Sequence, residues 1–172
     1  MRPISLFLCI SLGACAPPVA TVETTGATIG ALDRYRTFSF EGATTPPNGY
    51  HGTARGEDVV GIAEPLVADA LGRRGLAHAS QDGDLAVVVS VGRRVVDKTR
   101  PLSRTAVAVS GDRFETIQVP EGAVVIEAYD RRTHAQVWRG AATAEVDFDA
   151  SKLDKARAVR TIDSIMARFP NR

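Results

Sequence analysis

Two amphipathic helical patterns, separated by strand-like runs, constrain the fold more than any other feature of this sequence. Between Asp58 and Arg74 and again after Ser151, apolar residues recur at i, i+3, i+4 and i+7, the spacing of a helix with one apolar face. Such a face must be buried, so both helices need a common surface. The two faces consist of Val59, Ile62, Ala63, Leu66, Val67, Ala70 and Leu71, and of Leu153, Ala156, Val159, Ile162, Met166 and Phe169.

The runs outside the two helices have strand character. Alternation or β-branched content predicts four strands, the last two forming a hairpin. They are Tyr35–Phe40, Asp84–Val91, Ala123–Tyr129 and Gln136–Val146. The order of the elements predicts an α+β fold: a two-layer sandwich in which one mostly antiparallel sheet carries both helices on one face. The opening strand, helix and strand predict a right-handed crossover.

The segment 93–120 fits this scheme least. Thr105–Ser110 and Phe114–Val119 could form a short hairpin across Gly111-Asp112, and the alternative is a mobile insertion. Its structure stays open at the level of sequence.

Local signals mark the ends of the helices. Pro65 lies inside the first pattern, where a kink or a restart is more plausible than a broken element, because its ring presses on a glycine, Gly61. Gly75 is a plausible left-handed C-terminal cap. Ser151 with Asp154 three residues later predicts an N-cap for the second helix.

The first fifteen residues are typical of an export signal. The apolar run Ile4–Leu12 spans only about 13 to 14 Å as a helix, less than half of a bilayer core of roughly 30 Å. The run Leu12-Gly13-Ala14-Cys15 resembles the lipobox of bacterial lipoproteins, which implies cleavage before Cys15 and a diacylglycerol on its thiol. Ordinary secretion after Ala16 is the alternative, although Pro17 then follows the scissile bond. A cytosolic protein with a chance apolar start is the remaining alternative.

Cysteine content and charge agree with export. The chain has two cysteines, Cys9 inside the signal and Cys15 at its end, so the remaining chain has no free thiol, as suits an oxidising compartment. Lys+Arg is 21 against 20 for Asp+Glu, which argues against a nucleic-acid partner. We expect a signal peptide over 1–14, the lipidated Cys15 with a flexible tether over 15–32, and a single α+β domain over 33–172.

The ordered motifs are similar to those of a known family. They are Leu12–Cys15, Tyr35–Phe40, Leu71–Leu76, Asp84–Val87, Val125–Asp130, Val137–Ala142 and Arg168–Pro170. Together they resemble the bacterial lipoproteins catalogued as domain of unknown function 4136, over nearly all of the chain after the signal. The resemblance implies location and fold. That family has no settled biochemical activity, so no catalytic residue is carried over.

Chemistry-bearing motifs are weak. The three histidines, His51, His78 and His134, each stand alone, and no phosphate-binding loop, dinucleotide fingerprint or nucleophile elbow is present. The run His78–Asp82 holds triad-type residues, but triads assemble from separate segments. We therefore expect no enzyme, no cofactor and no metal site.

Two features have both a structural and a binding interpretation. The basic doublets Arg73-Arg74, Arg93-Arg94 and Arg131-Arg132 could contact lipid headgroups or glycan, although solvated faces and helix ends are the simpler interpretation. Trp138 could stack on a ligand, but its inward position in the hairpin favours a core role. We expect Trp138, Phe38 and Phe40 to form structural core.

These observations predict a membrane-anchored bacterial envelope lipoprotein, a periplasm-facing accessory or interaction module without catalytic activity. The alternative is a binder of a small molecule, lipid or glycan in a groove of the α+β domain. Ala16, rather than an aspartate, follows the cysteine, which in enterobacterial sorting implies the outer membrane. The expected partner is the membrane, through the lipid on Cys15; an envelope protein partner and the oligomeric state remain open.

Overall fold

One mixed sheet and two helices make up the fold. The computed structural model describes residues 20–26, 32–43, 45–103, 105, 111, 113–146 and 154–171. Its elements are β1 (Thr21–Gly26), β2 (Thr37–Gly42), α1 (Gly56–Gly72), β3 (Ala77–His78), β4 (Leu85–Pro101), β5 (Phe114–Asp130), β6 (Gln136–Glu145) and α3 (Lys155–Met166). The six-stranded sheet with its helices confirms the predicted α+β class. Within these residues no helix is long and apolar enough to cross a bilayer.

The strand order in the sheet is β1-β6-β5-β4-β2-β3. The pairs β1–β6, β6–β5 and β5–β4 are antiparallel, whereas β2 is parallel to both β4 and β3. The parallel pair β2–β4 is joined through α1, as a strand–helix–strand connection requires. The sheet is therefore mixed, with antiparallel pairing in the half that contains β1, β6 and β5.

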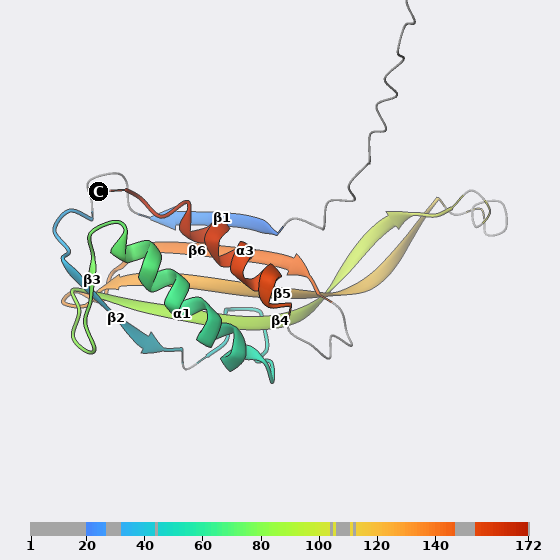
Figure 1. The fold of residues 1–172 in the computed structure, drawn as a ribbon. Helices are drawn as coiled ribbons and strands as arrows, with labels where there is room; N and C mark the ends of the chain where they lie inside the picture. Colours follow the sequence, from blue (N-terminus) through green and yellow to red (C-terminus); the bar gives the residue numbers. More distant parts are fainter. Residues whose placement is uncertain are drawn as a thin grey trace, which may run out of the picture.

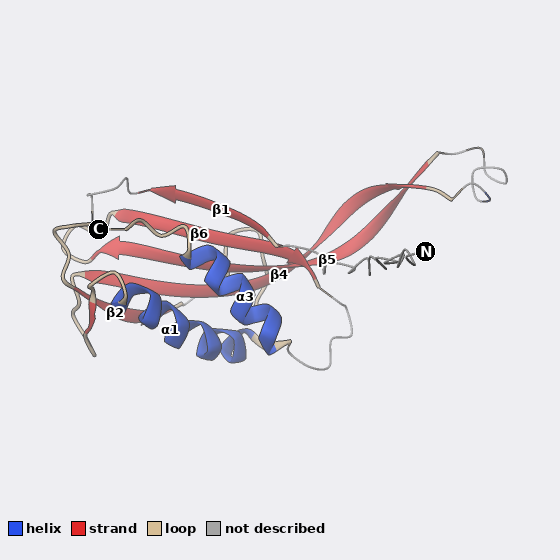
Figure 2. Cartoon of the chain, turned by 45° about the horizontal axis from the view of Figure 1, so that its top comes forward, coloured by secondary structure: helices blue, strands red, loops and turns tan. Residues whose placement is uncertain are grey.

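Both helices lie over the same face of the sheet (Figures 1 and 2). The main core forms between that face and the helices. Its largest fully buried members are Phe38, Leu32, Leu71, Leu85, Ile126, Ile162, Ile165, Val67 and Val87. Burying these side chains supplies most of the driving force for the fold, because apolar burial is the dominant favourable term in folding.

The helix ends follow local chemistry, with one correction. Helix α1 runs continuously through Pro65, and Gly75 beyond it has φ +80°, the left-handed conformation expected of a glycine there. Helix α3 begins later than predicted. Its N-cap is Asp154, whose side chain accepts a hydrogen bond from the backbone N–H of Arg157, and the predicted cap Ser151 lies outside the described residues.

The expectation of a flexible tether over 15–32 is wrong for residues 21–26. These residues form β1, which pairs along its whole length with β6, from Thr21 opposite Thr143 to Gly26 opposite Trp138. Five of the six side chains are exposed, and only Val22 is half-buried. A strand at a wet sheet edge has no apolar alternation to show, which is why the sequence pattern missed it.

The segment 93–120 is the second correction. Strands β4 and β5 each have 17 residues and pair from Leu85 opposite Asp130 to Pro101 opposite Phe114. The sequence left a short hairpin and a mobile insertion open. Phe114–Val119 is a strand, as in the hairpin alternative, but its partner is part of β4, and residues 106–110 lie outside the described residues. The distal part of this hairpin, Val95–Pro101 with Phe114–Pro120, projects beyond the body (Figure 1) and is called the arm below.

Candidate functional site

An apolar cavity of about 460 Å³ lies between the sheet and the first turns of the two helices. Its floor consists of small residues from the three central strands. The lining comprises Thr53, Ala54, Arg55, Val59, Val91, Gly92, Arg93, Gly122, Ala123, Val124, Ala142, Thr143, Ala144, Val146, Asp154, Arg157, Ala158 and Thr161. We call this cavity the groove. Its volume lies in the range of small-molecule sites.

The groove exists because the large core side chains stop short of it. Trp138 lies 2% exposed and its ring is 4.8 Å from that of Phe169. A Cβ at Gly140 would lie 2.4 Å from Trp138 Cη2 and 2.5 Å from Ile165 Cγ2, so glycine is required beneath the indole. Further along β6, on the same face, Ala142 and Ala144 place only methyl groups under the helices. The space above them is the groove.

Polar groups line the rim of the groove. Asp154 caps α3, and the Arg157 guanidinium donates a 2.6 Å hydrogen bond to the Glu145 carbonyl oxygen. Arg55 and Arg93 stand on the side nearest α1. An apolar interior with a few polar groups at its edge is the ordinary chemistry of a ligand site.

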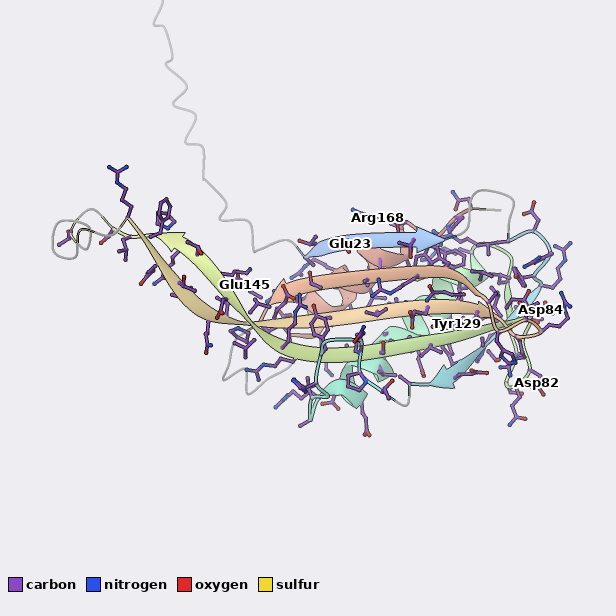
Figure 3. All side chains as sticks on the ribbon, turned by 180° about the vertical axis from the view of Figure 1, so that it is seen from behind. Glu23, Asp82, Asp84, Tyr129, Glu145 and Arg168 are labelled. Carbon is purple, nitrogen blue, oxygen red and sulfur yellow. The ribbon has the colours of Figure 1, made fainter. Side chains whose placement is uncertain are left out.

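A second recess, of about 360 Å³, is polar and lies at the end of the sheet away from the arm. Figure 3 shows Asp82 and Asp84 at that end, with Glu145 at the base of the arm. The lining of this polar recess comprises Arg34, Tyr35, Asp82, Gly83, Asp84, Asp130, Arg131 and Arg132.

Asp130 is the central carboxylate of the polar recess. One of its oxygens accepts from the backbone N–H groups of Arg132 (3.0 Å) and Thr133 (2.9 Å), and the other accepts from the Tyr35 hydroxyl (2.9 Å). The Arg34 guanidinium lies 3.2 Å from that second oxygen. The hydrogen bond from the Thr133 N–H, followed by that from Tyr35, lowers the pKa of Asp130 despite the opposing effect of burial. These contacts fix the β5–β6 turn against the residues that precede β2.

Arg131 and Asp84, like Asp130, connect parts of the chain that are far apart in the sequence. Arg131 donates to the Ser39 hydroxyl (2.9 Å) and to the Gly83 carbonyl (3.0 Å), and it forms a 2.8 Å ion pair with Glu41. Backbone N–H groups of Arg36 and Thr37 donate to Asp84 at 2.7 and 2.9 Å and lower its pKa. These charged side chains of the polar recess are therefore bound to other parts of the fold.

A third cluster lies where the arm leaves the sheet. The Tyr50 hydroxyl and the Arg94 guanidinium both donate to Glu121 Oε1, at 2.7 and 2.9 Å, and Arg94 stacks over the Tyr50 ring. Burial and the hydrogen bond to Glu121 raise the pKa of Tyr50 to about 12. Burial acts to raise the pKa of Glu121, but the hydrogen bonds from Tyr50 and Arg94 outweigh burial, so the pKa of Glu121 lies below its ordinary value. The cluster joins the loop before α1 to both arm strands.

The residues singled out in the sequence take the following places. Trp138 and Phe38 are in the core, whereas Phe40 is only half-buried and packs against its edge. Cys15 lies outside the described residues. Among the described residues no group of three or more His, Cys, Asp or Glu is placed to hold a metal ion.

The histidines are separate in space and in role. His78 packs against the rings of Phe38 and Phe40, with centroids 5.1 and 5.6 Å apart. His51 forms a backbone bridge to Arg93, and His134 adopts φ +57° in the β5–β6 turn.

In each basic doublet, one arginine forms hydrogen bonds that connect different parts of the fold. Arg74 donates to the carbonyl oxygens of Ala70 and Met166 and stacks over Phe169, which ties α1 to the end of α3. Arg94 and Arg131 bind the clusters described above.

Sequence reasoning missed the precise position of the groove, although a signal was present. The run Gly140-Ala141-Ala142-Thr143-Ala144 supplies small side chains to a strand that faces helices, and Gly122-Ala123 does the same on β5. Small residues facing small residues leave unfilled volume unless the helices move closer. The polar recess had no such signal, because its partners Tyr35 and Asp130 are far apart in sequence.

Comparisons with known proteins concern family and fold. A family model described as a domain of unknown function (DUF4136) matches residues 22–171. A comparison with curated proteins found no match.

Solved structures with a similar fold come from several bacteria. A PelC dodecamer from Paraburkholderia phytofirmans has a TM-score of 0.51 at 16% identity, covering 90% of this chain and 100% of that one. A PDZ domain protein from Parabacteroides distasonis has a TM-score of 0.54 at 13% identity, covering 88% of this chain and only 35% of that one. A DUF4136 family protein from Bacteroides thetaiotaomicron has a TM-score of 0.48 at 10% identity, covering 87% and 95%. At these identities the first two likenesses concern the fold alone.

Proposed function

The chain belongs to the family of the domain of unknown function 4136, and from this premise we propose that it is a lipid-anchored accessory protein of the bacterial cell envelope. In this proposal Cys15 carries the lipid, the body is a two-layer sandwich facing the periplasm, and the anchoring membrane is the outer membrane. The body acts as an interaction module and catalyses no reaction.

The observation that carries the proposal is the closeness of the first strand to the lipobox cysteine. Strand β1 begins at Thr21, so five residues separate it from Cys15, and the six Cα–Cα steps span at most ~20 Å. A lipid on Cys15 would keep the start of the sheet within about 20 Å of the headgroups. A short link suits a protein that works at the membrane surface.

The chemistry of the described residues supports a non-catalytic role. Asp84, Glu121 and Asp130 each have a lowered pKa, and each accepts hydrogen bonds from neighbouring parts of the fold. A general acid needs a raised pKa near the working pH. These carboxylates stay ionised and bound to structural partners.

The test of the anchor is metabolic labelling with a fatty acid. Cys15→Ala is expected to abolish the label and to leave an unprocessed or released protein. Cys9→Ala is the matched control, because Cys9 leaves with the signal, and it should label normally. Labelled Cys15→Ala protein would overturn the proposal. Fractionation of the wild-type protein on a density gradient tests the membrane, and co-migration with inner-membrane markers would reject the outer one.

The groove favours a second function, the binding of a small apolar ligand. Its mostly aliphatic lining and its volume of about 460 Å³ are the specific observation. Ala144→Leu adds bulk to the floor and is expected to abolish binding of a fluorescent fatty acid. Gln136→Leu, on the same strand but outside the groove, should bind like the wild type. Equal binding by both variants, or none by the wild type, would reject this function.

A further inference from the structure

The arm has no described partner of its own. Its strands pair with each other from Val95 opposite Pro120 to Pro101 opposite Phe114. Among the described residues, the one backbone contact from another strand's end is the bond from the Val146 N–H to the Pro120 carbonyl, at the base. A two-stranded hairpin is at best marginally stable alone in water. The arm is therefore a candidate for contact with a further surface.

The two faces of the arm differ in charge. Cross-strand partners share a face, and one face carries Val95, Asp97, Thr99 and Pro101 with Phe114, Thr116, Gln118 and Pro120. Asp97 is the single charged residue of that set, which we call the neutral face. Its Val95 and Phe114 are 50% and 62% exposed, and they are the exposed large hydrophobic residues of the described chain.

The opposite face carries the charges, and these are paired. Lys98 binds Glu145 and Arg100 binds Glu115, both at 2.5 Å. Val96, Ile117 and Val119 lie half-buried on the same face. Because its cations already have carboxylate partners, this face has little net charge to offer a ligand. The neutral face, with Phe114 at its outer end, is the surface left for docking.

The arm and the proposed anchor leave the body at the same end. Strand β1 starts opposite Thr143, two residues before Glu145, and Glu145 binds Lys98 of the arm. Figures 1 and 2 show the start of β1 beside the base of the arm. The chain from Cys15 to Thr21 reaches at most ~20 Å, and the seven pairs of the arm extend about 23 Å. A body held this closely has its arm within reach of the bilayer.

We infer that the neutral face of the arm is a membrane-contact surface, with Phe114 in the headgroup region of the bilayer that holds the lipid on Cys15. This inference rests on the proposed function, because the lipid brings the arm to the bilayer. Aromatic side chains are favoured at the membrane–water interface, and Asp97 is the single charged side chain that this face would bring near the headgroups. The lipid supplies the affinity, and the arm fixes how the body is oriented. Since the face carries no cation, the contact does not require anionic lipid.

The test uses the full lipidated chain, purified from membranes and reconstituted into phosphatidylethanolamine/phosphatidylglycerol vesicles. Phe114→Trp places a fluorophore on the neutral face, and Glu115→Trp places one on the next residue, on the opposite face. The native Trp138 is buried and gives a constant background. We expect Phe114→Trp emission to shift to shorter wavelength and to be quenched by lipids that carry a spin label near the headgroup. Glu115→Trp emission should be quenched less.

Each outcome discriminates. Quenching of Phe114→Trp no greater than that of the wild type, in a protein shown by mass to carry lipid, overturns the inference and leaves the anchor intact. A blue shift that depends on protein concentration and not on the spin label assigns the neutral face to a second copy of the chain, which also overturns it. A mass without lipid on Cys15 overturns the proposed function and the inference together. Thermal unfolding of both variants checks that the body is folded.

Discussion

At the scale of single residues, the side chains that matter most are those for which a neighbour has been made small. Trp138 occupies the space that Gly140 leaves, and Phe169 packs against the other side of the indole. Its neighbour Arg139 lies on the opposite face of β6, where it forms a 3.5 Å ion pair with Glu127. Adjacent positions on one strand thus have very different roles.

This contrast predicts the effect of two adjacent substitutions. Trp138→Ala should cost about 3 to 5 kcal/mol of unfolding free energy, because it removes a buried aromatic and leaves a cavity. Arg139→Ala should change stability by about 1 kcal/mol or less, since half-exposed ion pairs contribute little. Urea unfolding of a chain that begins at Ala20 measures both. A larger loss from Arg139→Ala would show that the register of β6 is wrong.

Tyr50 predicts a pH dependence. Its folded pKa of about 12 lies above the unfolded value of about 10, so the neutral phenol is favoured in the folded state. The stability that this gives is fully present below about pH 10 and is lost as the pH rises toward about 12.

Tyr50→Phe is expected to remove that alkaline loss, and to lower stability near neutral pH by about 1 kcal/mol through the lost hydrogen bond to Glu121. Urea unfolding of both proteins across the alkaline range provides the measurement. The raised pKa values of Tyr35 and Tyr129 are common to the two proteins and cancel in the comparison. Parallel stability curves would contradict the prediction.

At the scale of elements, the sequence was informative wherever one side of an element is dry and the other wet. Helix α1, the inner parts of β4 and β5, and the β5–β6 hairpin all show the expected period. The exposed strand β1 does not, because almost all of it meets water, whereas the arm alternates in burial but lies outside the part of the sheet that the helices cover. The position of the groove could not be predicted for another reason: a cavity depends on how closely two helices approach a sheet, which no single segment encodes.

Strand β1 is expected to protect the edge of the sheet. Its backbone pairs with β6 from Thr143 to Trp138, and the Arg168 guanidinium donates to the Val22 carbonyl (Figure 3 labels Arg168 near Glu23). A chain that begins at residue 27 should lose about 2 kcal/mol or more relative to one that begins at Ala20. Its uncovered β6 edge should also favour self-association. Urea unfolding and size-exclusion chromatography test this, and equal stability with a monomer in both cases would contradict it.

At the scale of the whole molecule, the two ends of the sheet have different chemistry. One end carries the polar recess, where Asp130, Arg131 and Asp84 hold loops together. The other end carries the groove, the arm and the start of β1. Sequence reasoning predicted the two helices and the main strands of the body, whereas the export signal stays a prediction. It could not tell that the groove, the arm and the proposed anchor share one end, because that depends on pairing between residues far apart in the chain.

Under the proposed function, the pairing of β1 with β6 would also set the order of events during export. A chain that crosses a membrane from its N-terminus delivers Thr21 long before Thr143, so β1 has no partner until almost the whole polypeptide has emerged. Until then the chain between Cys15 and β2 is the link that joins the nascent body to the membrane. Docking of β1 shortens that link as the last strand is added. Completion of the sheet and approach to the bilayer are thus one event, and a folding delay in β6 would appear as a delay in surface attachment.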